Sequence, residues 1–551
     1  MMPYARIQYS IFSSSSLIAT RCPSSNPPTT FQCHHVIFYP TLVFHTFQGP
    51  LHGKASEQSR STYVFCTTSM AVADGGDVGQ VTIDMLPDDV LLDIFDFCLK
   101  EPPYFIQDWS HTRSYSRTRT WQKLVHVCRR WRDVIFQSPR RLDLQICCTT
   151  STPVKEMPNI WPTLPLIVYV GGYTGTWSMG NIIAAFKHRD RICGISINHS
   201  SKILLETLLP VMREPFPALA SLDLVSHHGM ARIPDYFLGG SAPHLRHLHL
   251  KAIQFLALPK LLLSATDLVT LTLSDVPHSG YISPEAIVTS LSAMTSLKSF
   301  HLEFQSPRSR PDQRSQHLPP STRSVLPALT YFNFEGSSEY LESILARIDA
   351  APLLDCLEIF FFNQPIFQTP YLSQFISHVP KFQALKEARV VISRGIVSVR
   401  VLSPMRTLAR RVLTVGISRR DMGWRFSSLV QLCTSSLPLL TAEHLHMVFP
   451  PLHWQDIEKS QLLELLHQFV AVKNLYLSKK FVAFIAPALQ ELVGERVIEV
   501  LPALQKLFLV DLHPPGPDQE AIGQFLRARS LSSHPVTVLR WVVERWMLDD
   551  W

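Results

Sequence analysis

The chain has 551 residues, of which 46% are apolar and 17% charged, and its formal net charge is +7. It is long enough to bury a large core, in several domains or in one elongated repeat domain, and its modest, dispersed charge does not indicate a nucleic-acid-binding protein. The ten cysteines are scattered without a CxxC pair, which argues against a disulfide framework or a zinc knuckle and favours a reducing compartment, cytoplasmic or nuclear.

The N-terminal segment has no sign of a fold. Residues 1–56 contain no Asp or Glu and show neither helical nor strand periodicity. Arg6 and Arg21 are too few for a mitochondrial transit peptide, and nearby prolines interrupt any amphipathic helix. We therefore expect residues 1–79 to be a disordered or wrongly assigned extension, with translation starting at Met1 or at Met70.

Two amphipathic helices are predicted next. The first begins at Pro87, because a proline costs no hydrogen bond at the first helical position, and Asp88 and Asp89 complement the positive helix end. The second covers residues 120–135. The apolar residues that follow helical spacing are Val90, Leu91, Ile94, Phe95 and Cys98 in the first helix, and Leu124, Val127, Cys128, Trp131 and Val134 in the second.

Taken in order, these residues resemble the F-box, whose pattern is Leu-Pro, an apolar helix, then Val-Cys and Trp. The resemblance implies a short helical module, residues 80–139, that binds a Skp-family adaptor and ties the protein to a cullin-RING ubiquitin ligase. The adaptor-binding residues that it implies are Leu86, Pro87, Val90, Leu91, Ile94, Phe95, Leu99, Leu124, Val127, Cys128 and Trp131.

One departure from the F-box pattern separates the two helices. Residues 101–119 form a polar, Arg-rich insert where F-box proteins usually have a shorter connection, so the middle helix of the module is undefined. We expect this insert to be a surface loop. The alternative to the F-box is a pair of ordinary core helices, since an apolar stripe most often faces a core.

From about residue 190 the chain repeats the apolar pattern x-L-x-x-L-x-L. Its first anchors recur every 23 to 32 residues, close to the roughly 20–29 residues of leucine-rich repeats. The pattern blurs between Phe382 and Met447. The anchor sets are 192/195/197, 219/222/224, 245/248/250, 268/271/273, 297/300/302, 329/332/334, 354/357/359, 472/475/477 and 504/507/509.

The segments between the anchors have helical character. Residues 283–294 and 337–348 show helical spacing after a capping Ser. The sequence therefore predicts an α/β fold in which an N-terminal helical F-box precedes an irregular leucine-rich-repeat solenoid over residues 140–530, with one strand and one helix per repeat. This resembles the repeat domain of fungal F-box proteins; the alternative is a mixed α/β domain with ordinary strands.

Three smaller elements complete the predicted solenoid. A strand at 140–146 starts the stack, and a mobile loop at 305–324 interrupts it. Residues 531–551 form a C-terminal cap, in which 536–548 is a helix with Leu539, Val542, Val543, Trp546 and Met547 on one face.

Side chains between the anchors point to the opposite face of the predicted sheet. That face is polar with scattered aromatics, a composition typical of protein recognition, although any one position is open to the alternative of an ordinary solvated residue. The residues expected to bind a protein substrate are His247, His249, His301, Glu303, Tyr331, Asn333, Glu335 and Tyr476.

We expect the chain to be a substrate-receptor subunit of an SCF-type cullin-RING ubiquitin ligase, or alternatively a leucine-rich-repeat scaffold without a role in ubiquitin transfer. The sequence shows no convergent nucleophile, base or cofactor motif, so we expect neither enzyme activity nor a cofactor. His244, His247 and His249 have no Cys, Asp or Glu nearby in sequence to complete a metal site. The basic runs lack interleaved aromatics and no apolar run spans a membrane, so we expect no nucleic-acid or membrane partner.

Overall fold

The structure is a computed structural model, and its contacts divide the chain into two units, residues 1–90 and 91–551. In the first unit β1 (Phe44–His45) pairs antiparallel with β2 (Phe65–Cys66). The rest of the predicted extension at 1–79 and the insert at 101–119 lie outside the described residues. The structure describes residues 44–45, 65–66, 85–99, 121, 123–149, 164–171, 179–199, 202–227, 231–309, 323–349, 351–364, 366–392, 396–403, 412–418, 425–436, 441–448, 458–492, 496–510 and 517–541.

Two short helices form where the F-box resemblance places them. α1 (Asp88–Leu99) begins one residue after Pro87, and α3 (Arg129–Gln137) follows the insert. The rings of Phe95 and Trp131 lie 4.8 Å apart, and both side chains are buried. The boundary between the two units falls inside α1, so the remainder of this helical region belongs to the same unit as the repeats.

The second helix is shorter than predicted. Residues 125–127 form a turn, and Cys128 is extended (φ −153°, ψ 172°). Its Sγ accepts a hydrogen bond from the N–H of Trp131, so Cys128 caps α3. The prediction of one continuous helix over 120–135 is therefore wrong, because a cap and a turn interrupt it.

Within the described residues, the repeat region forms one sheet of sixteen strands. Nine of them coincide with the nine predicted anchor sets, and the anchors of neighbouring strands are in register, as in the pairing of Leu248 with Leu271 and of Leu271 with Phe300. These nine strands are β5 (Ile192–His199), β6 (Ser221–Ser226), β8 (His247–Lys251), β10 (Thr270–Val276), β11 (Ser299–Phe304), β13 (Tyr331–Gly336), β15 (Cys356–Phe361), β20 (Asn474–Leu477) and β21 (Lys506–Val510). The prediction of an α/β solenoid with a strand in each repeat is confirmed.

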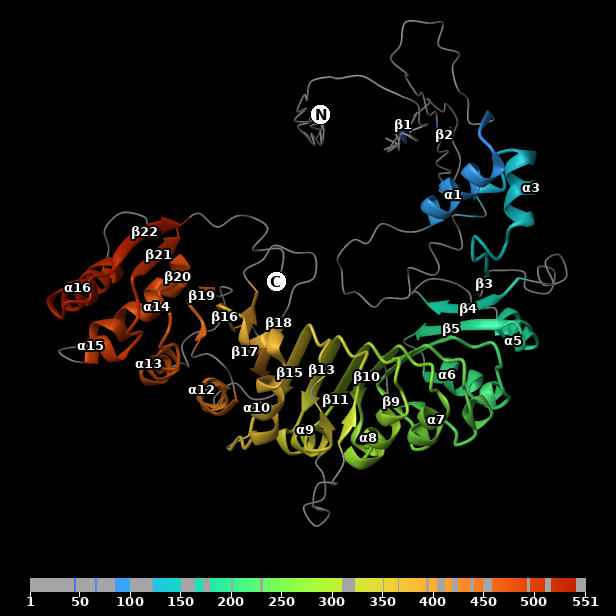
Figure 1. Cartoon of the computed structure of the whole chain (residues 1–551). Helices are drawn as coiled ribbons and strands as arrows, with labels where there is room; N and C mark the ends of the chain where they lie inside the picture. Colours follow the sequence, from blue (N-terminus) through green and yellow to red (C-terminus); the bar gives the residue numbers. More distant parts are fainter. Residues whose placement is uncertain are drawn as a thin grey trace, which may run out of the picture. The chain divides into compact units, whose positions relative to one another are not determined.

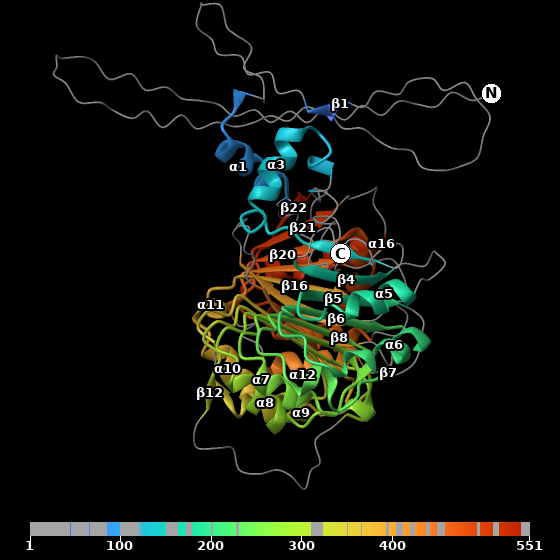
Figure 2. The same ribbon diagram turned by 90° about the vertical axis from the view of Figure 1, so that its right-hand side faces the viewer.

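Helices cover the anchor side of this sheet. Figure 1 shows α7, α8, α9 and α10 in a row along one face, and in Figure 2 α5 and α6 lie to one side of successive strands. Ser283 and Ser337 cap α8 and α9 through their side chains, as predicted. The helices are α5 (Met179–Phe186), α6 (Lys202–Leu208), α7 (Leu258–Ser264), α8 (Pro284–Ser292), α9 (Ser338–Leu345), α10 (Pro370–Ser377), α11 (Pro380–Gln383), α12 (Arg425–Ser436), α13 (Lys459–His467), α14 (Lys479–Gln490), α15 (Arg496–Glu499) and α16 (Pro517–Leu531).

An antiparallel insertion explains why the repeat pattern blurs after Phe382. β16 (Glu387–Ile392) does not pair with the preceding strand β15; it pairs antiparallel with β17 (Val397–Leu402), which pairs antiparallel with β18 (Val412–Ile417). β18 then pairs with β15, and β19 (His444–Val448) pairs with β16. The strand order in this region is therefore β15-β18-β17-β16-β19, and no single repeat length describes it.

Both ends of the sheet differ from the predictions. Residues 139–143 form a turn in which Asp143 has a positive φ of 47°, so β3 (Ile146–Cys148) starts later than the strand predicted at 140–146 and pairs with β4 (Leu166–Gly171). At the other end, β22 (Thr537–Trp541) pairs with β21 where a capping helix is predicted. Thr537 and Val538 are β-branched and favour the extended backbone, so the helix prediction is wrong for residues 537–541; residues 542–551 lie outside the described ones.

A buried arginine holds the C-terminal repeats together. Arg529 on α16 is fully buried, and its guanidinium donates to the carbonyl oxygens of Val497, Pro502 and Leu504. Val497 lies in the short helix α15, and Pro502 and Leu504 follow it; carbonyls in and beyond the last turn of a helix have no helical N–H to satisfy them. The guanidinium of Arg529 therefore donates the hydrogen bonds that backbone N–H groups do not supply to these carbonyls.

We predict that Arg529→Ala lowers the free energy of unfolding by about 3–5 kcal/mol, because it leaves buried carbonyls unpaired and opens a cavity. Urea unfolding followed by tryptophan fluorescence measures the change. Arg527→Ala is the matched control, since Arg527 lies on the same helix but is exposed. Equal midpoints for the two variants would contradict this role of Arg529.

Glu342 links two consecutive helices. Its carboxylate, on α9, accepts hydrogen bonds from the backbone N–H groups of Tyr371 and Leu372 in the first turn of α10. Burial raises the pKa of Glu342 to about 7 from 4.5, and the two N–H groups only partly oppose this shift. The folded state thus favours the protonated carboxyl.

We predict that this carboxyl contributes stability fully below about pH 4.5 and loses it as the pH rises through about 7, a change of about 3 kcal/mol. Urea midpoints between pH 4.5 and pH 8 should therefore fall more in the native protein than in Glu342→Gln, which keeps an uncharged acceptor. Parallel pH profiles of the two proteins would rule the assignment out.

Candidate binding surface

The face of the sheet opposite the helices carries an aligned row of polar and aromatic side chains. Each member lies in register with the next on the neighbouring strand, so the row crosses nearly the whole sheet. From β4 to β21 the row consists of Tyr169, Ser196, Asp223, His249, Thr272, His301, Asn333, Glu358, Thr414, Arg400, Arg389, His446, Tyr476 and Phe508. We call it the central row.

A buried carboxylate organises one end of the central row. Asp223 is fully buried; its Oδ2 accepts a hydrogen bond of 2.8 Å from Ser196 Oγ, and its Oδ1 lies 2.7 Å from His249 Nδ1. His249, a predicted substrate residue, is therefore fixed by a neighbour on β6. His247, predicted alongside it, is exposed at the start of β8.

Carboxylates gather at the ends of β10, β11 and β13. His301 Nε2 lies 3.5 Å from Glu303 Oε2. Burial raises the pKa of Glu303, but the hydrogen bond and charge of His301, with the charge of Lys251, outweigh burial and leave this pKa below its usual value. Burial and the charge of Glu303 raise the pKa of Glu335, which lies opposite it on β13. His301 and Glu303 thus lie close together, and Glu303 lies opposite Glu335 on the neighbouring strand.

Tyr331 and Asn333 converge on one acceptor. The hydroxyl of Tyr331 donates to Glu358 Oε2 at 2.8 Å, and the amide of Asn333 donates to the same oxygen at 3.0 Å. Burial, followed by the charge of Glu358, raises the pKa of Tyr331 well above its usual value. The two predicted residues therefore share Glu358 on the next strand, β15.

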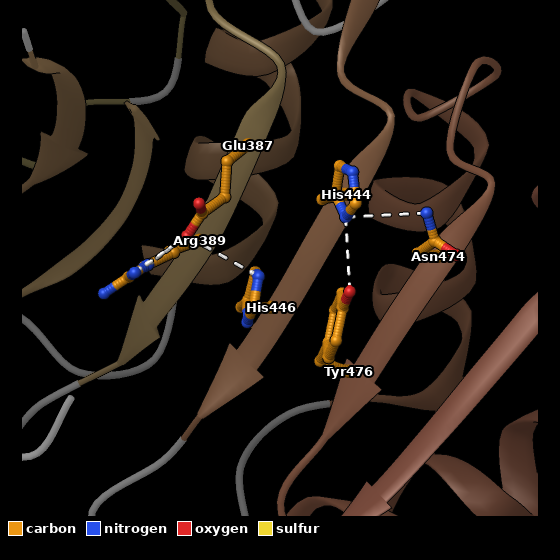
Figure 3. Close-up of polar contacts among 6 residues, drawn as sticks. All are labelled: Glu387, Arg389, His444, His446, Asn474 and Tyr476. Atoms are coloured by element: carbon orange, nitrogen blue, oxygen red, sulfur yellow. Dashed lines mark hydrogen bonds and ion pairs between the residues drawn. The ribbon is translucent and has the colours of Figure 1, made fainter. Parts of the chain in front are cut away.

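The last predicted residue, Tyr476, belongs to a separate aromatic stack. Five strands lie between β13 and β20, so Tyr476 is remote from the other predicted residues. Its ring stacks on His446 at 4.1 Å and on Phe508 at 4.4 Å, with interplanar angles of 1° and 11°. Figure 3 shows His444, on the same strand as His446, beside the Tyr476 hydroxyl and Asn474.

Arg389 and Glu387 flank this stack. The guanidinium of Arg389 donates to Glu387 Oε1 from Nε at 2.9 Å and from a terminal nitrogen at 2.7 Å (Figure 3). Burial, and next the charges of Arg389 and His444, lower the pKa of His446 to about 3. His446 is therefore a neutral ring at physiological pH.

The sequence prediction omits the middle of the central row. Arg389, Arg400, Thr414 and His446 lie on strands of the antiparallel insertion or beside it, where the repeat period is lost. The sequence does contain a signal: residues 397–401, V-S-V-R-V, alternate strictly between apolar and polar, which places Ser398 and Arg400 on the polar face. The alternation shows the face of a residue, but it does not show which strand lies next to it.

The residues implied to bind an adaptor fall into two groups. Leu91, Phe95, Leu99 and Trp131 are buried and so form the core of the helical region. Pro87, Val90 and Val127 are exposed, whereas Leu86, Ile94, Leu124 and Cys128 are half-buried. The structure therefore makes the second group the better candidates for contact with a partner.

The described residues contain neither a metal-binding cluster nor a membrane-spanning helix. No group of three or more His, Cys, Asp or Glu side chains among them is arranged to hold a metal ion. None of their helices is both long enough and apolar enough to cross a membrane.

We predict that Asp223→Ala lowers the free energy of unfolding by about 2–4 kcal/mol, because it leaves a buried hydroxyl and an imidazole without their shared partner. Asp267→Ala is the control: this exposed carboxylate lies 3.9 Å from His244 and should contribute almost nothing. Urea unfolding of both variants tests the prediction, and a small effect for Asp223 would show that the network is not structural.

Comparisons with known proteins assign no family. No protein-family model matches the chain, and no curated protein matches it. Among solved structures, the leucine-rich repeat-containing protein LegL7 from Legionella pneumophila is 15% identical, with 69% of this chain and 97% of that chain covered and a TM-score of 0.23. At that TM-score the likeness adds nothing to the fold, which the strand pairing of this chain establishes by itself.

Proposed function

We propose that this protein is a substrate-receptor subunit of an SCF-type cullin-RING ubiquitin ligase. In this proposal the helical region around α1 and α3 binds a Skp-family adaptor, and the polar face of the sheet binds a protein target. The two surfaces are chemically different, since one is apolar and the other polar and aromatic.

The observation that carries the adaptor role is a second apolar face on α1. Leu91, Phe95 and Leu99 occupy the buried face of the helix. Val90, Ile94 and Phe97 are spaced i, i+4 and i+7 and thus share a different face, on which Phe97 is 66% exposed. Exposed apolar stripes of this kind are typical of helices that dock on a partner.

The turn before α3 contributes to the same proposal. Val127 is 59% exposed, and it belongs to the Val-Cys pair of the F-box pattern. Each apolar side chain buried against a partner contributes about 1.5–3 kcal/mol, so a few such residues suffice for a stable complex after the costs of association.

The proposed receptor does not itself catalyse ubiquitin transfer. Its contribution is to hold a target close to the ubiquitin-carrying enzyme, which raises the effective concentration of the reacting groups. The polar face suits this task because its side chains are held by hydrogen bonds between strands, as at Asp223 and Glu358.

The second candidate function is a repeat scaffold without a ubiquitin ligase. It is favoured by the extent of the polar face, since the sheet alone offers a protein-binding surface whether or not the helical region has a partner. Co-purification of a cullin together with the adaptor distinguishes the two functions.

We predict that the full chain, co-expressed with a Skp-family adaptor, forms a stoichiometric complex on size exclusion. Two double variants, Leu86→Ala with Pro87→Ala and Ile94→Ala with Phe97→Ala, should lose it, because each removes apolar contacts with the adaptor. The matched control is Leu256→Ala with Leu263→Ala, which truncates two exposed leucines of the repeat region. Retention of the adaptor by both docking variants, or no complex with the native chain, would refute the adaptor role.

A further inference from the structure

Two arginines face each other at the centre of the polar face. β16 and β17 run antiparallel, and their register places Arg389 directly opposite Arg400. Side chains at directly opposed positions are about 5 Å apart at Cβ, where like charges repel. Such a pair needs a source of negative charge.

Glu387 supplies this charge to Arg389. It accepts both hydrogen bonds described above from Arg389, and it also lies 3.5 Å from His446. The register neighbours of Arg400 are Arg389 on one side and Thr414 on the other. On its own strand the nearest residues of the same face are Ser398 and Leu402. Among the described residues, the carboxylates closest in the register are Glu387, opposite Leu402, and Glu358, opposite Thr414, and neither lies directly opposite Arg400.

Hydrogen-bonding groups around Arg400 are also unpartnered. Among the described residues, the Nε of Arg400 and the hydroxyls of Thr414 and Ser398 are buried without a hydrogen-bond partner. Thr414 and Ser398 are 0% and 1% exposed. Buried polar atoms are nearly always paired in folded proteins, so three neighbouring exceptions indicate a missing acceptor.

The strand arrangement that creates this cluster is itself specific. Gly416, opposite Ser398, has no room for a side chain, because a Cβ there would lie 2.6 Å from the Cβ of Ser398. The glycine allows β17 to pair closely with β18, and this pairing sets Thr414 opposite Arg400. The cluster thus depends on the insertion and has no equivalent in the regular repeats.

We propose that Arg400, Arg389 and Thr414 form a binding site for an oxyanion of the phosphate class. A phosphoryl group offers several oxygens to the two guanidinium groups and to the hydroxyl, and its charge offsets the repulsion between the arginines. The biological role of the site rests on the proposed function, in which this face receives a target; a phosphorylated side chain of that target and free phosphate are the two sources of the group.

The aromatic stack beside the site is the second part of the surface such a ligand would meet. His446 lies opposite Arg389, and Tyr476 and Phe508 follow in the central row. An extended segment that runs from Arg400 across β16 toward β19 would lie over these rings. A segment that carries an apolar residue beside its phosphorylated one therefore fits the surface better than a free ion.

Titration of the full chain with inorganic phosphate, at constant ionic strength, tests the site by calorimetry and by the rise in Tm. We expect saturable binding with a Kd on the order of 1 mM, and a loss of about tenfold in affinity for Arg400→Gln. Lys251→Gln is the matched control: it removes one positive charge from the same face at β8, and phosphate affinity should not change. No saturable binding, or equal affinities for the native protein and Arg400→Gln, would overturn the proposal.

Thr414→Val separates a ligand-binding role from a structural one. It replaces an unpartnered hydroxyl by a methyl group of similar size, so the Tm without phosphate should stay equal or rise, whereas phosphate affinity should fall about threefold. A lower Tm together with unchanged affinity would contradict the assignment of the hydroxyl.

N-acetyl-phosphoserine amide distinguishes the two sources. Tighter binding of this compound than of inorganic phosphate supports a phosphorylated side chain, and the reverse order supports the free ion. These titrations need no adaptor. A failure to bind phosphate would therefore not count against the adaptor role, and a failure to form the adaptor complex would not count against the phosphate site.

Discussion

The alignment of apolar anchors across neighbouring strands is the constraint on which the rest of the structure depends. A strand has two faces, and a shift of one residue in register would exchange them completely. Burial of the anchors against the helices therefore fixes the position of every polar residue on the other face. The central row exists because Leu222, Leu248 and Leu271 pair in line with one another.

This constraint explains which parts of the fold could be predicted from the sequence. The anchors carry their own period, so nine strands and the capped helices α8 and α9 follow from residue spacing alone. The positions of Tyr331 and Asn333 on the polar face follow too, because they alternate with Phe332 and Phe334. Their shared acceptor Glu358 is one repeat away, at the corresponding position of the next strand.

The remaining features depend on information that spacing does not contain. The order β15-β18-β17-β16-β19 depends on which strands pair, and the strands at 387–392, 397–402 and 412–417 have the same residue pattern whichever neighbours they have. The capping role of Cys128 depends on its own backbone angles, and the strand at 537–541 shows both strand and helix character in its sequence. Tertiary pairing decides these cases, so the aligned arginines were beyond the reach of the sequence prediction.

The antiparallel insertion also has a consequence for how the repeats assemble. Paired residues on neighbouring strands of the regular repeats from β6 to β15 are 23 to 32 positions apart in the sequence. Cys356 and Val412 are 56 positions apart, and Glu387 and His444 are 57 positions apart. Closing these longer loops costs more chain entropy and delays pairing. We therefore expect the repeats on either side of the insertion to fold as two separate cooperative blocks. The pairings of β15 with β18 and of β16 with β19 should form last during folding and break first during unfolding.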